Sequence, residues 1–319
     1  MSWKPNTSLN NLVARAKLNR SVREFFGRRN IMEVETPLLC SSTATDPHLH
    51  SFEVSWGEDT FYLQTSPEFS MKRLLAAGCG SIYQICKAFR QDETSPRHNG
   101  EFTLLEWYRP NWTLEQLLAE IEALVLDCAS AFGIQLQPFP RLSYEQCFQQ
   151  VLGINPHQCS DQTLLDLANQ HIHGNFNDLD RNGLLDLLMS HLVEPTLPET
   201  GVFVVDFPAS QASLAKCSQN HDDLTVAKRA ELFLNGMEIA NAYQELVDAA
   251  EQESRIKQDL LVRKEKGLSV PPKPHHLIAA LQNGFPECSG VAVGMDRLLL
   301  LLTQQPNLAE VISFPTDKA

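Results

Sequence analysis

The chain has 319 residues, of which 43% are hydrophobic, and its formal net charge is −13. This length supplies a sizeable core, and no apolar run approaches the ~18 residues of a membrane-spanning helix. The polar N-terminus lacks the hydrophobic core of a signal peptide, so we expect a cytoplasmic protein with no membrane partner. The acidic balance also disfavours a long nucleic acid as the main partner, because proteins that bind one usually present a basic surface.

The first part of the chain mixes a helix with short extended segments. The hydrophobic pattern predicts a helix over about residues 9–29, followed by extended segments at 34–39 and 61–65. Residues 66–68, Ser-Pro-Glu, begin a second helix that Gly78 ends, since proline suits the first helical position and glycine the C-terminal end.

A hairpin and a long helix follow. Residues 81–86 and 102–109 are predicted to pair as antiparallel strands around an unusually long charged loop, 90–100. Thr113 begins the clearest helix, because Gln116 stands three residues later in a capping-box arrangement.

The second half of the chain continues the mixture. Helices are predicted at 143–195, 247–266 and 296–302, and strands at 202–207, 237–246 and 289–294. Within the first of these helical ranges, Ser143 and Ser160 are predicted to begin helices. We therefore expect an α+β fold with a largely antiparallel sheet flanked by helices. It is predicted to form one domain, 1–319, with a helical insert at about 141–200.

The loop of the predicted hairpin concentrates residues suited to a nucleotide. Arg90, Arg97 and His98 gather beside the aromatic ring of Phe102. Guanidinium groups bind phosphate oxygens through paired hydrogen bonds, and a flat apolar ring packs against a base. The alternative is a charged loop that is only solvated.

A second group of candidate residues joins a strand to a helix near the C-terminus. Gly290 and Gly294 leave room for a ligand to approach the backbone. Arg297 follows at the start of the helix, where the helix dipole also favours a phosphate.

A third group places Glu238, Asn241 and Glu245 in one apolar segment. Buried carboxylates need a cation, and Mg²⁺ takes oxygen ligands beside phosphates. A separation of seven residues puts the two glutamates on opposite faces of an ideal strand. A bulge or a strand end must therefore lie between them if both face one site. The alternative is a pair of surface acids on an edge strand.

The eight cysteines form no CxxC pair. A zinc site needs clustered cysteine and histidine at ligand spacing, so we expect reduced cysteines and no zinc.

Together these segments resemble the three signature motifs of class II aminoacyl-tRNA synthetases. The motifs correspond to residues 31–37, 89–103 and 290–297, with a closing segment at 311–315, so the resemblance covers nearly the whole chain. The segments 65–74 and 97–108 are similar to those of the lysyl enzymes.

A motif 1 helix that begins within about ten residues of the N-terminus leaves no room for an anticodon-binding domain, and we expect none. With the acidic charge, this makes extensive tRNA binding unexpected. The chain resembles instead the elongation factor P–(R)-β-lysine ligases, a family of free-standing paralogues of lysyl-tRNA synthetase. Ala292 agrees with them, because lysyl-tRNA synthetases tend to have glycine there and the added methyl group would reshape the amino-acid pocket.

The resemblance implies ATP as a substrate, Mg²⁺ as its companion and a homodimer built on the motif 1 helix. It implies a role in ATP binding for Arg90, Gln91, Asp92, His98, Asn99, Glu101, Phe102, Glu238, Ile239, Gly294 and Arg297. It implies a role in amino-acid binding for Ser66, Pro67, Glu68, Glu106, Tyr108, Asn241, Glu245 and Ala292. The implied catalytic residues are Arg90, Arg297, Glu238 and Glu245, the last two also as Mg²⁺ ligands.

The reaction that this resemblance implies is ATP-dependent activation of (R)-β-lysine or lysine as the adenylate, followed by transfer to a lysine side chain of elongation factor P. The alternatives are a truncated lysyl-tRNA synthetase that charges tRNA, a non-catalytic paralogue, and a class II amide-forming enzyme for another amino acid. One departure lies in motif 2, which usually contains Arg-Asn-Glu. This chain has Arg90-Gln91-Asp92, with an acid one methylene shorter.

Overall fold

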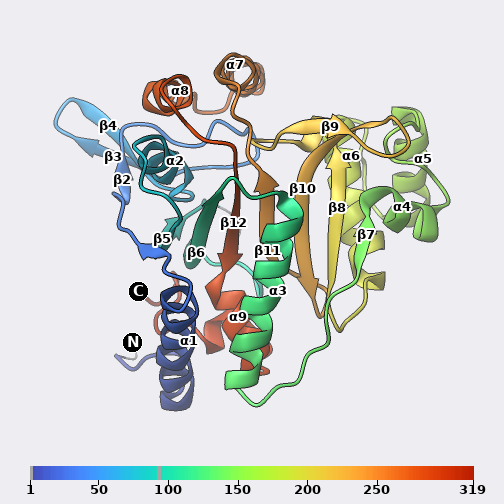
Figure 1. Cartoon of the computed structure of the whole chain (residues 1–319). Helices are drawn as coiled ribbons and strands as arrows, with labels where there is room; N and C mark the ends of the chain where they lie inside the picture. The colour runs from blue at the N-terminus through green and yellow to red at the C-terminus, as the bar shows by residue number, and fades with distance from the viewer. Residues whose placement is uncertain (1–2, 92–94) are drawn as a thin grey trace. The chain divides into compact units, whose positions relative to one another are not determined.

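The computed structural model describes residues 3–91 and 95–319 (Figure 1). The chain divides into two compact units. The first unit comprises the chain up to Leu136 together with Leu246–Ala319, and the second is Gln137–Glu245. None of the described helices is long and apolar enough to cross a membrane.

The main sheet of the first unit contains four strands in the order β1-β5-β6-β12. They are β1 (Met32–Glu33), β5 (Ile82–Phe89), β6 (Glu101–Pro110) and β12 (Cys288–Gly294). Strand β1 runs parallel to β5, and the other two pairs are antiparallel. The predicted hairpin, β5–β6, is confirmed.

One face of this sheet packs against α1 (Leu9–Gly27) and α3 (Leu114–Ala131). The ring of Phe26 stacks on Tyr83 with centroids 4.3 Å apart and meets Trp107 edge-on at 5.3 Å. The indole of Trp107 donates a hydrogen bond to Glu120 of α3, at 3.1 Å. Thr113 and Gln116 form the predicted capping box.

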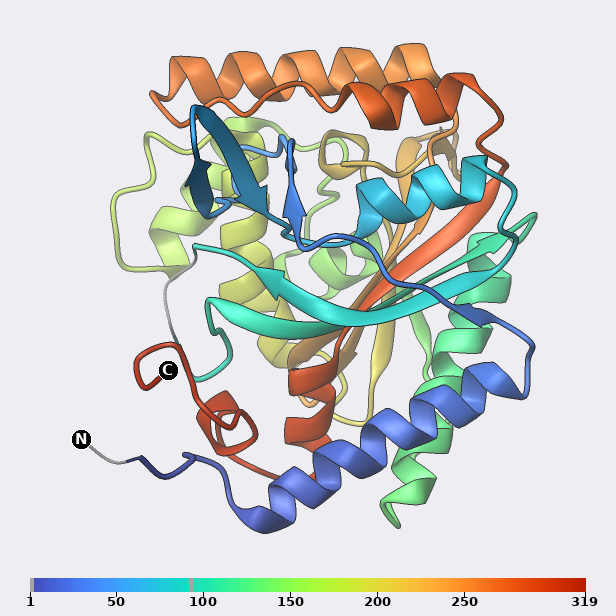
Figure 2. The ribbon, with the colours of Figure 1, turned by 90° about the vertical axis from the view of Figure 1, so that its left-hand side faces the viewer.

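The opposite face carries a second hydrophobic cluster with α2 (Glu68–Ala76), α7 (Ala249–Glu265) and α8 (His275–Gln282). The cluster joins residues of all three helices to three residues of the sheet, and its members include Met71, Ile256, Leu277, Ile82 and Tyr108. Helices α7 and α8 run side by side along this face (Figure 2). Helix α9 (Met295–Leu302) follows β12 directly.

A small sheet of the first unit has the order β2-β4-β3, formed by β2 (Leu39–Cys40), β4 (Asp59–Leu63) and β3 (Glu53–Trp56). Arg263 of α7 ties the neighbouring loop in place by donating hydrogen bonds to the carbonyls of Asp46 and Leu49.

The second unit has strands in the order β11-β10-β8-β7, with β9 also paired to β10. They are β7 (Arg141–Ser143), β8 (Val202–Pro208), β9 (Cys217–Gln219), β10 (Thr225–Leu234) and β11 (Met237–Gln244). Only β7 and β8 run parallel among the pairs described within this unit.

Helices α4 (Tyr144–Leu152), α5 (Asp161–His171) and α6 (Arg181–Leu188) contribute to the apolar cluster of the second unit. Ser143 and Ser160 cap α4 and α5, as predicted, by accepting from the backbone three residues later. These helices fall within the range expected for a helical insert, and the predicted α+β class with mostly antiparallel pairing is confirmed.

Strand β10 and helix α8 were not among the predicted elements. The hydrophobic pattern of β10 is interrupted by Lys228, Arg229 and Glu231, although Glu231 is buried. A usable signal was nonetheless present, because Asn235-Gly236 is a characteristic two-residue hairpin turn, and both residues have positive φ here, 51° and 63°.

Candidate active site

The β5–β6 hairpin positions the residues of motif 2. Phe89 pairs with Glu101, and the next backbone hydrogen bond, from Arg90 N to Gly100 O at 2.9 Å, extends the ladder into the loop. The Arg90 guanidinium thereby lies 5.1 Å from the centroid of the Phe102 ring. Its buried Nε makes no hydrogen bond to any part of the chain that the structure describes. A cation beside an aromatic face, with a donor to spare, suits a phosphate next to a planar base.

Three further residues predicted to bind ATP make contacts within the protein. The Asn99 side chain donates to the carbonyl of Glu101 at 2.6 Å and accepts from the backbone of Thr316 at 3.1 Å. Glu101 forms a half-exposed ion pair with Lys87, at 3.2 Å. The backbone of Gln91 donates to the carbonyl of His50 at 2.8 Å. Asp92, also predicted to bind ATP, lies outside the described residues.

Motif 3 meets motif 2 through Arg297. Gly294 ends β12, and Arg297 stands in the first turn of α9. Its guanidinium lies 2.9 Å from Nε2 of His98 and also approaches the carbonyl of Arg97, at 3.4 Å. His98 lies 2.8 Å from the hydroxyl of Ser95 through Nδ1, so both ring nitrogens have partners. Arg297 and His98, both predicted to bind ATP, are therefore adjacent despite their 199-residue separation.

Asp296 is a structural anchor that the sequence reasoning did not identify. Its buried carboxylate accepts from the backbone of Thr103 at 2.6 Å and forms an ion pair with Arg15 of α1. It therefore joins the motif 1 helix, the start of β6 and the start of α9. The only local signal was an acidic residue in the first turn of a helix, next to Arg297.

The strand register places on one face of the sheet the residues of β6 and β12 that are predicted to bind the amino-acid substrate. Glu106 pairs with Ala292, and Tyr108 pairs with Gly290. The Tyr108 hydroxyl donates to Glu106 Oε1 at 2.7 Å, and Glu106 is only 2% exposed. A buried carboxylate and a hydroxyl beside a glycine and an alanine can accommodate an organic cation.

Glu68 begins α2, where the Ser66 hydroxyl accepts from the Glu68 backbone at 3.1 Å and Pro67 stands at the N-cap. The Glu68 carboxylate lies 2.7 Å from Nζ of Lys72, which is 1% exposed. Lys72 was not among the predicted binding residues. An amino group that binds at Glu68 must therefore share this carboxylate with a buried internal cation.

In the second unit, a β-bulge supplies the geometry that the spacing of the two glutamates requires. Phe233 pairs with Glu238, whereas Leu232 pairs with Ala240, so Ile239 is the extra residue on β11. The bulge shifts the alternation by one position and brings Glu238 to the same face as Asn241 and Glu245. Glu245 is 1% exposed.

The same face carries an ion pair that the sequence reasoning missed. Arg229 and Glu231 of β10 pair with Tyr243 and Asn241 of β11, and the Arg229–Glu231 distance is 2.5 Å. Burial raises the pKa of Glu231 to about 7, because the charge of Glu238 adds to the desolvation and the Arg229 guanidinium only partly offsets them.

The described residues contain no group of three metal-binding side chains. Glu238 of β11 and Glu245, which directly follows this strand, nonetheless fit Mg²⁺, which is commonly held by one or two carboxylates together with phosphate oxygens of the substrate. The eight cysteines are all free, in agreement with the expected reduced state.

Comparison with known proteins agrees with this geometry. The family model of class II tRNA synthetases (D, K and N) matches residues 1–318. A protein named elongation factor P–(R)-β-lysine ligase from Pseudoalteromonas translucida is 46% identical over 329 residues, covering 99% of this chain and 98% of that protein. Its namesake from Salmonella arizonae is 44% identical over 330 residues, covering 100% and 98%. The chain belongs to the class II tRNA synthetase family (D, K and N).

Proposed function

We propose that this protein activates (R)-β-lysine with ATP and transfers the aminoacyl group to a lysine side chain of elongation factor P. The proposal depends on two contacts within the β5–β6 hairpin. The Arg90 guanidinium lies beside the Phe102 ring, and the Tyr108 hydroxyl donates a hydrogen bond to Glu106. One end of this hairpin suits a nucleotide and its middle suits a cationic side chain. The names of the relatives support the choice of amino acid and acceptor.

In the first step, the amino-acid carboxylate attacks the α-phosphorus of ATP in line with the departing pyrophosphate, forming the aminoacyl-adenylate. Arg90 holds the α-phosphate and the carboxylate, and Arg297 with His98 holds the outer phosphates. Phe102 stacks on the adenine. The protein contributes positioning and charge stabilisation.

Glu238 and Glu245 would hold Mg²⁺, which when bound would supply positive charge to the phosphates of ATP. Glu106 and Tyr108 bind the distal ammonium of the substrate. In the second step, the amine of the acceptor lysine attacks the adenylate carbonyl carbon, loses a proton, and displaces AMP. No covalent enzyme intermediate is required. We place the reaction in the cytoplasm, where free cysteines are stable.

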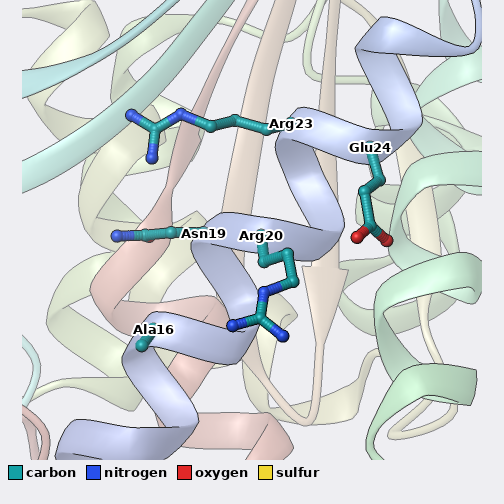
Figure 3. Close-up of a pocket in the computed structure, with 5 residues that line it drawn as sticks. All are labelled: Ala16, Asn19, Arg20, Arg23 and Glu24. Atoms are coloured by element: carbon teal, nitrogen blue, oxygen red, sulfur yellow. The ribbon is translucent and has the colours of Figure 1, made fainter.

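We also propose that the protein acts as a homodimer through α1. Leu9 and Val13 are 75% and 61% exposed on this helix. An open hollow of about 590 Å³ continues along it, lined by Ala16, Asn19, Arg20, Arg23 and Glu24 (Figure 3). Leu9, Val13, Ala16 and Arg20 recur at helical spacing on one face, and an exposed stripe of this kind suits a partner helix.

The test is amino-acid-dependent exchange of pyrophosphate into ATP with (R)-β-lysine and with α-lysine, followed by transfer to purified elongation factor P or to tRNA. We expect exchange with (R)-β-lysine and label on elongation factor P. Arg90→Gln serves as the inactive variant, and Arg28→Gln as the matched control, because Arg28 forms a surface ion pair with Asp127. Exchange with α-lysine and label on tRNA would instead establish a minimal tRNA synthetase, and no exchange at all would contradict both.

A further inference from the structure

The β10–β11 hairpin of the second unit carries a hydrogen-bonded chain of three side chains on one face. Glu231 lies directly opposite Asn241, and Arg229 lies opposite Tyr243. Glu231 Oε1 accepts from Arg229 Nη2 at 2.5 Å and from Asn241 Nδ2 at 3.2 Å. One carboxylate oxygen therefore joins the guanidinium to the amide.

Arg229 is itself held on several sides. Its Nη1 donates to the carbonyl of Gln211 at 2.9 Å, and its guanidinium lies over the ring of Phe207 at 4.6 Å. Tyr243 adds a second ring at 6.0 Å. A guanidinium fixed by a carbonyl and two rings has little rotational freedom, so it holds the Glu231 carboxylate in one orientation.

This arrangement determines which end of the Asn241 amide faces Glu231. The reversed amide would place Oδ1 against a carboxylate, with two acceptors in contact, whereas the observed one places the NH₂ group there. Oδ1 is consequently at the other end of the amide, where it is buried and accepts no hydrogen bond from the described residues. A buried amide oxygen without a donor costs free energy, and a bound ligand that donates removes this cost.

The chemistry of the face indicates the class of donor. Glu238, Asn241 and Glu245 share it, so it presents two carboxylates and an amide oxygen. Such a set favours a positively charged donor, and the substrate ammonium group is one.

We propose that Glu231, held by Arg229, is a positioning residue that fixes the Asn241 amide with its oxygen directed at an ammonium group of the amino-acid substrate. This inference rests on the proposed function and deepens it, because it assigns a role in amino-acid recognition to two residues of β10.

The experiment compares two routes for removing Glu231. Glu231→Leu alone leaves the partly buried Arg229 charge without its carboxylate and is expected to destabilise the fold. Arg229→Met combined with Glu231→Leu removes both charges, and such replacements are often neutral for stability. The double variant should therefore fold, with a melting temperature near that of the unmodified protein, but lack the group that orients Asn241.

For this double variant, we expect the KM and Kd of (R)-β-lysine or lysine to rise roughly tenfold to a hundredfold, the effect of losing a hydrogen bond to a charged group. The KM of ATP should stay within about twofold. Asn241→Leu should have a similar effect, and adding it to the double variant should change little, because both act through the same oxygen. Glu231→Gln keeps an acceptor oxygen and should recover most of the affinity.

Several results would overturn the inference. Unchanged amino-acid affinity in the folded double variant, with an active unmodified protein, would contradict it alone and leave the proposed function intact. If the KM of ATP or of Mg²⁺ rose and the KM of the amino acid did not, the result would show that Asn241 Oδ1 contacts the nucleotide or its metal, and the inference would be wrong. If the unmodified protein bound neither amino acid, both proposals would fail.

Discussion

At the residue scale, the contact between Arg90 and Phe102 places a positive charge beside a flat aromatic ring in the proposed nucleotide site. The guanidinium lies against one aromatic ring that is also a predicted platform for adenine. A ring at this position can hold the arginine away from solvent and still present a flat surface to the base.

Replacing Phe102 by leucine should therefore weaken ATP binding without abolishing catalysis. Stacking of a base on an aromatic ring contributes about 1–3 kcal/mol, so we expect the KM of ATP to rise at least about fivefold. Pyrophosphate exchange at varied ATP measures it. Phe61→Leu is the matched control, because that ring packs on Trp56 in the small sheet. An unchanged KM of ATP in Phe102→Leu would exclude stacking at this ring.

Ala292 is expected to influence which amino acid the protein selects. Its methyl group lies on the same sheet face as Glu106, directly across the strand pair. Removing it with Ala292→Gly enlarges the pocket beside the carboxylate, and a difference of one methyl group is commonly worth about 1–3 kcal/mol in discrimination. We expect the ratio of exchange with α-lysine to exchange with (R)-β-lysine to rise about tenfold. An unchanged ratio would show that selection occurs elsewhere.

At the element scale, a network of side chains attaches α1 to the sheet. Glu33 of β1 accepts from Arg23 of α1 at 2.9 Å and from the Tyr83 hydroxyl of β5 at 2.9 Å. The Arg23 hydrogen bond is the main cause that lowers the pKa of Glu33, with a further contribution from Tyr83, although partial burial opposes both.

This network predicts a pH-dependent stability difference for Glu33→Gln. Since the folded pKa of Glu33 is depressed, its stabilisation is present above the ordinary value of 4.5 and is lost as the pH falls through the folded pKa. The pair is partly exposed, so we expect a loss of only about 0.5 kcal/mol at pH 7. Urea unfolding at pH 7, 5 and about 3 measures it. A difference that persists at the lowest pH would exclude an ionic origin.

At the scale of the whole molecule, the exposed stripe on α1 is the surface on which the proposed homodimer depends. Val13→Asp introduces a charge at a position that is 61% exposed, so the fold of the single chain should be little affected. Within a dimer interface the same charge would be desolvated, and we expect the dimer Kd to rise at least tenfold. Light scattering after size-exclusion chromatography measures the mass. Arg28→Gln, which changes a surface ion pair with Asp127 outside this stripe, is the control.

The fold could be predicted from the sequence wherever local signals were strong. Thr113, Ser143 and Ser160 each begin a helix as expected, because capping hydrogen bonds depend only on residues within one turn. Strand β10 was missed because two polar residues face its interior side, Glu231 buried and Arg229 partly buried. Their burial depends on each other and on the face of β11, which no local window contains.

The sequence by itself determined the family and the order of the motifs, since these reside in residue identities and their spacing. It also identified Arg90, Phe102 and Arg297 as candidate nucleotide-binding residues, and it required a bulge or a strand end between Glu238 and Glu245 if both face one site. The tertiary structure decided where that bulge falls, at Ile239, and that Asp296 anchors Arg15 and Thr103. It also decided that Glu231 accepts hydrogen bonds from both Arg229 and Asn241. The physical reason is that strand register and buried ion pairs join residues far apart in the chain, so their geometry exists only once the strands are paired.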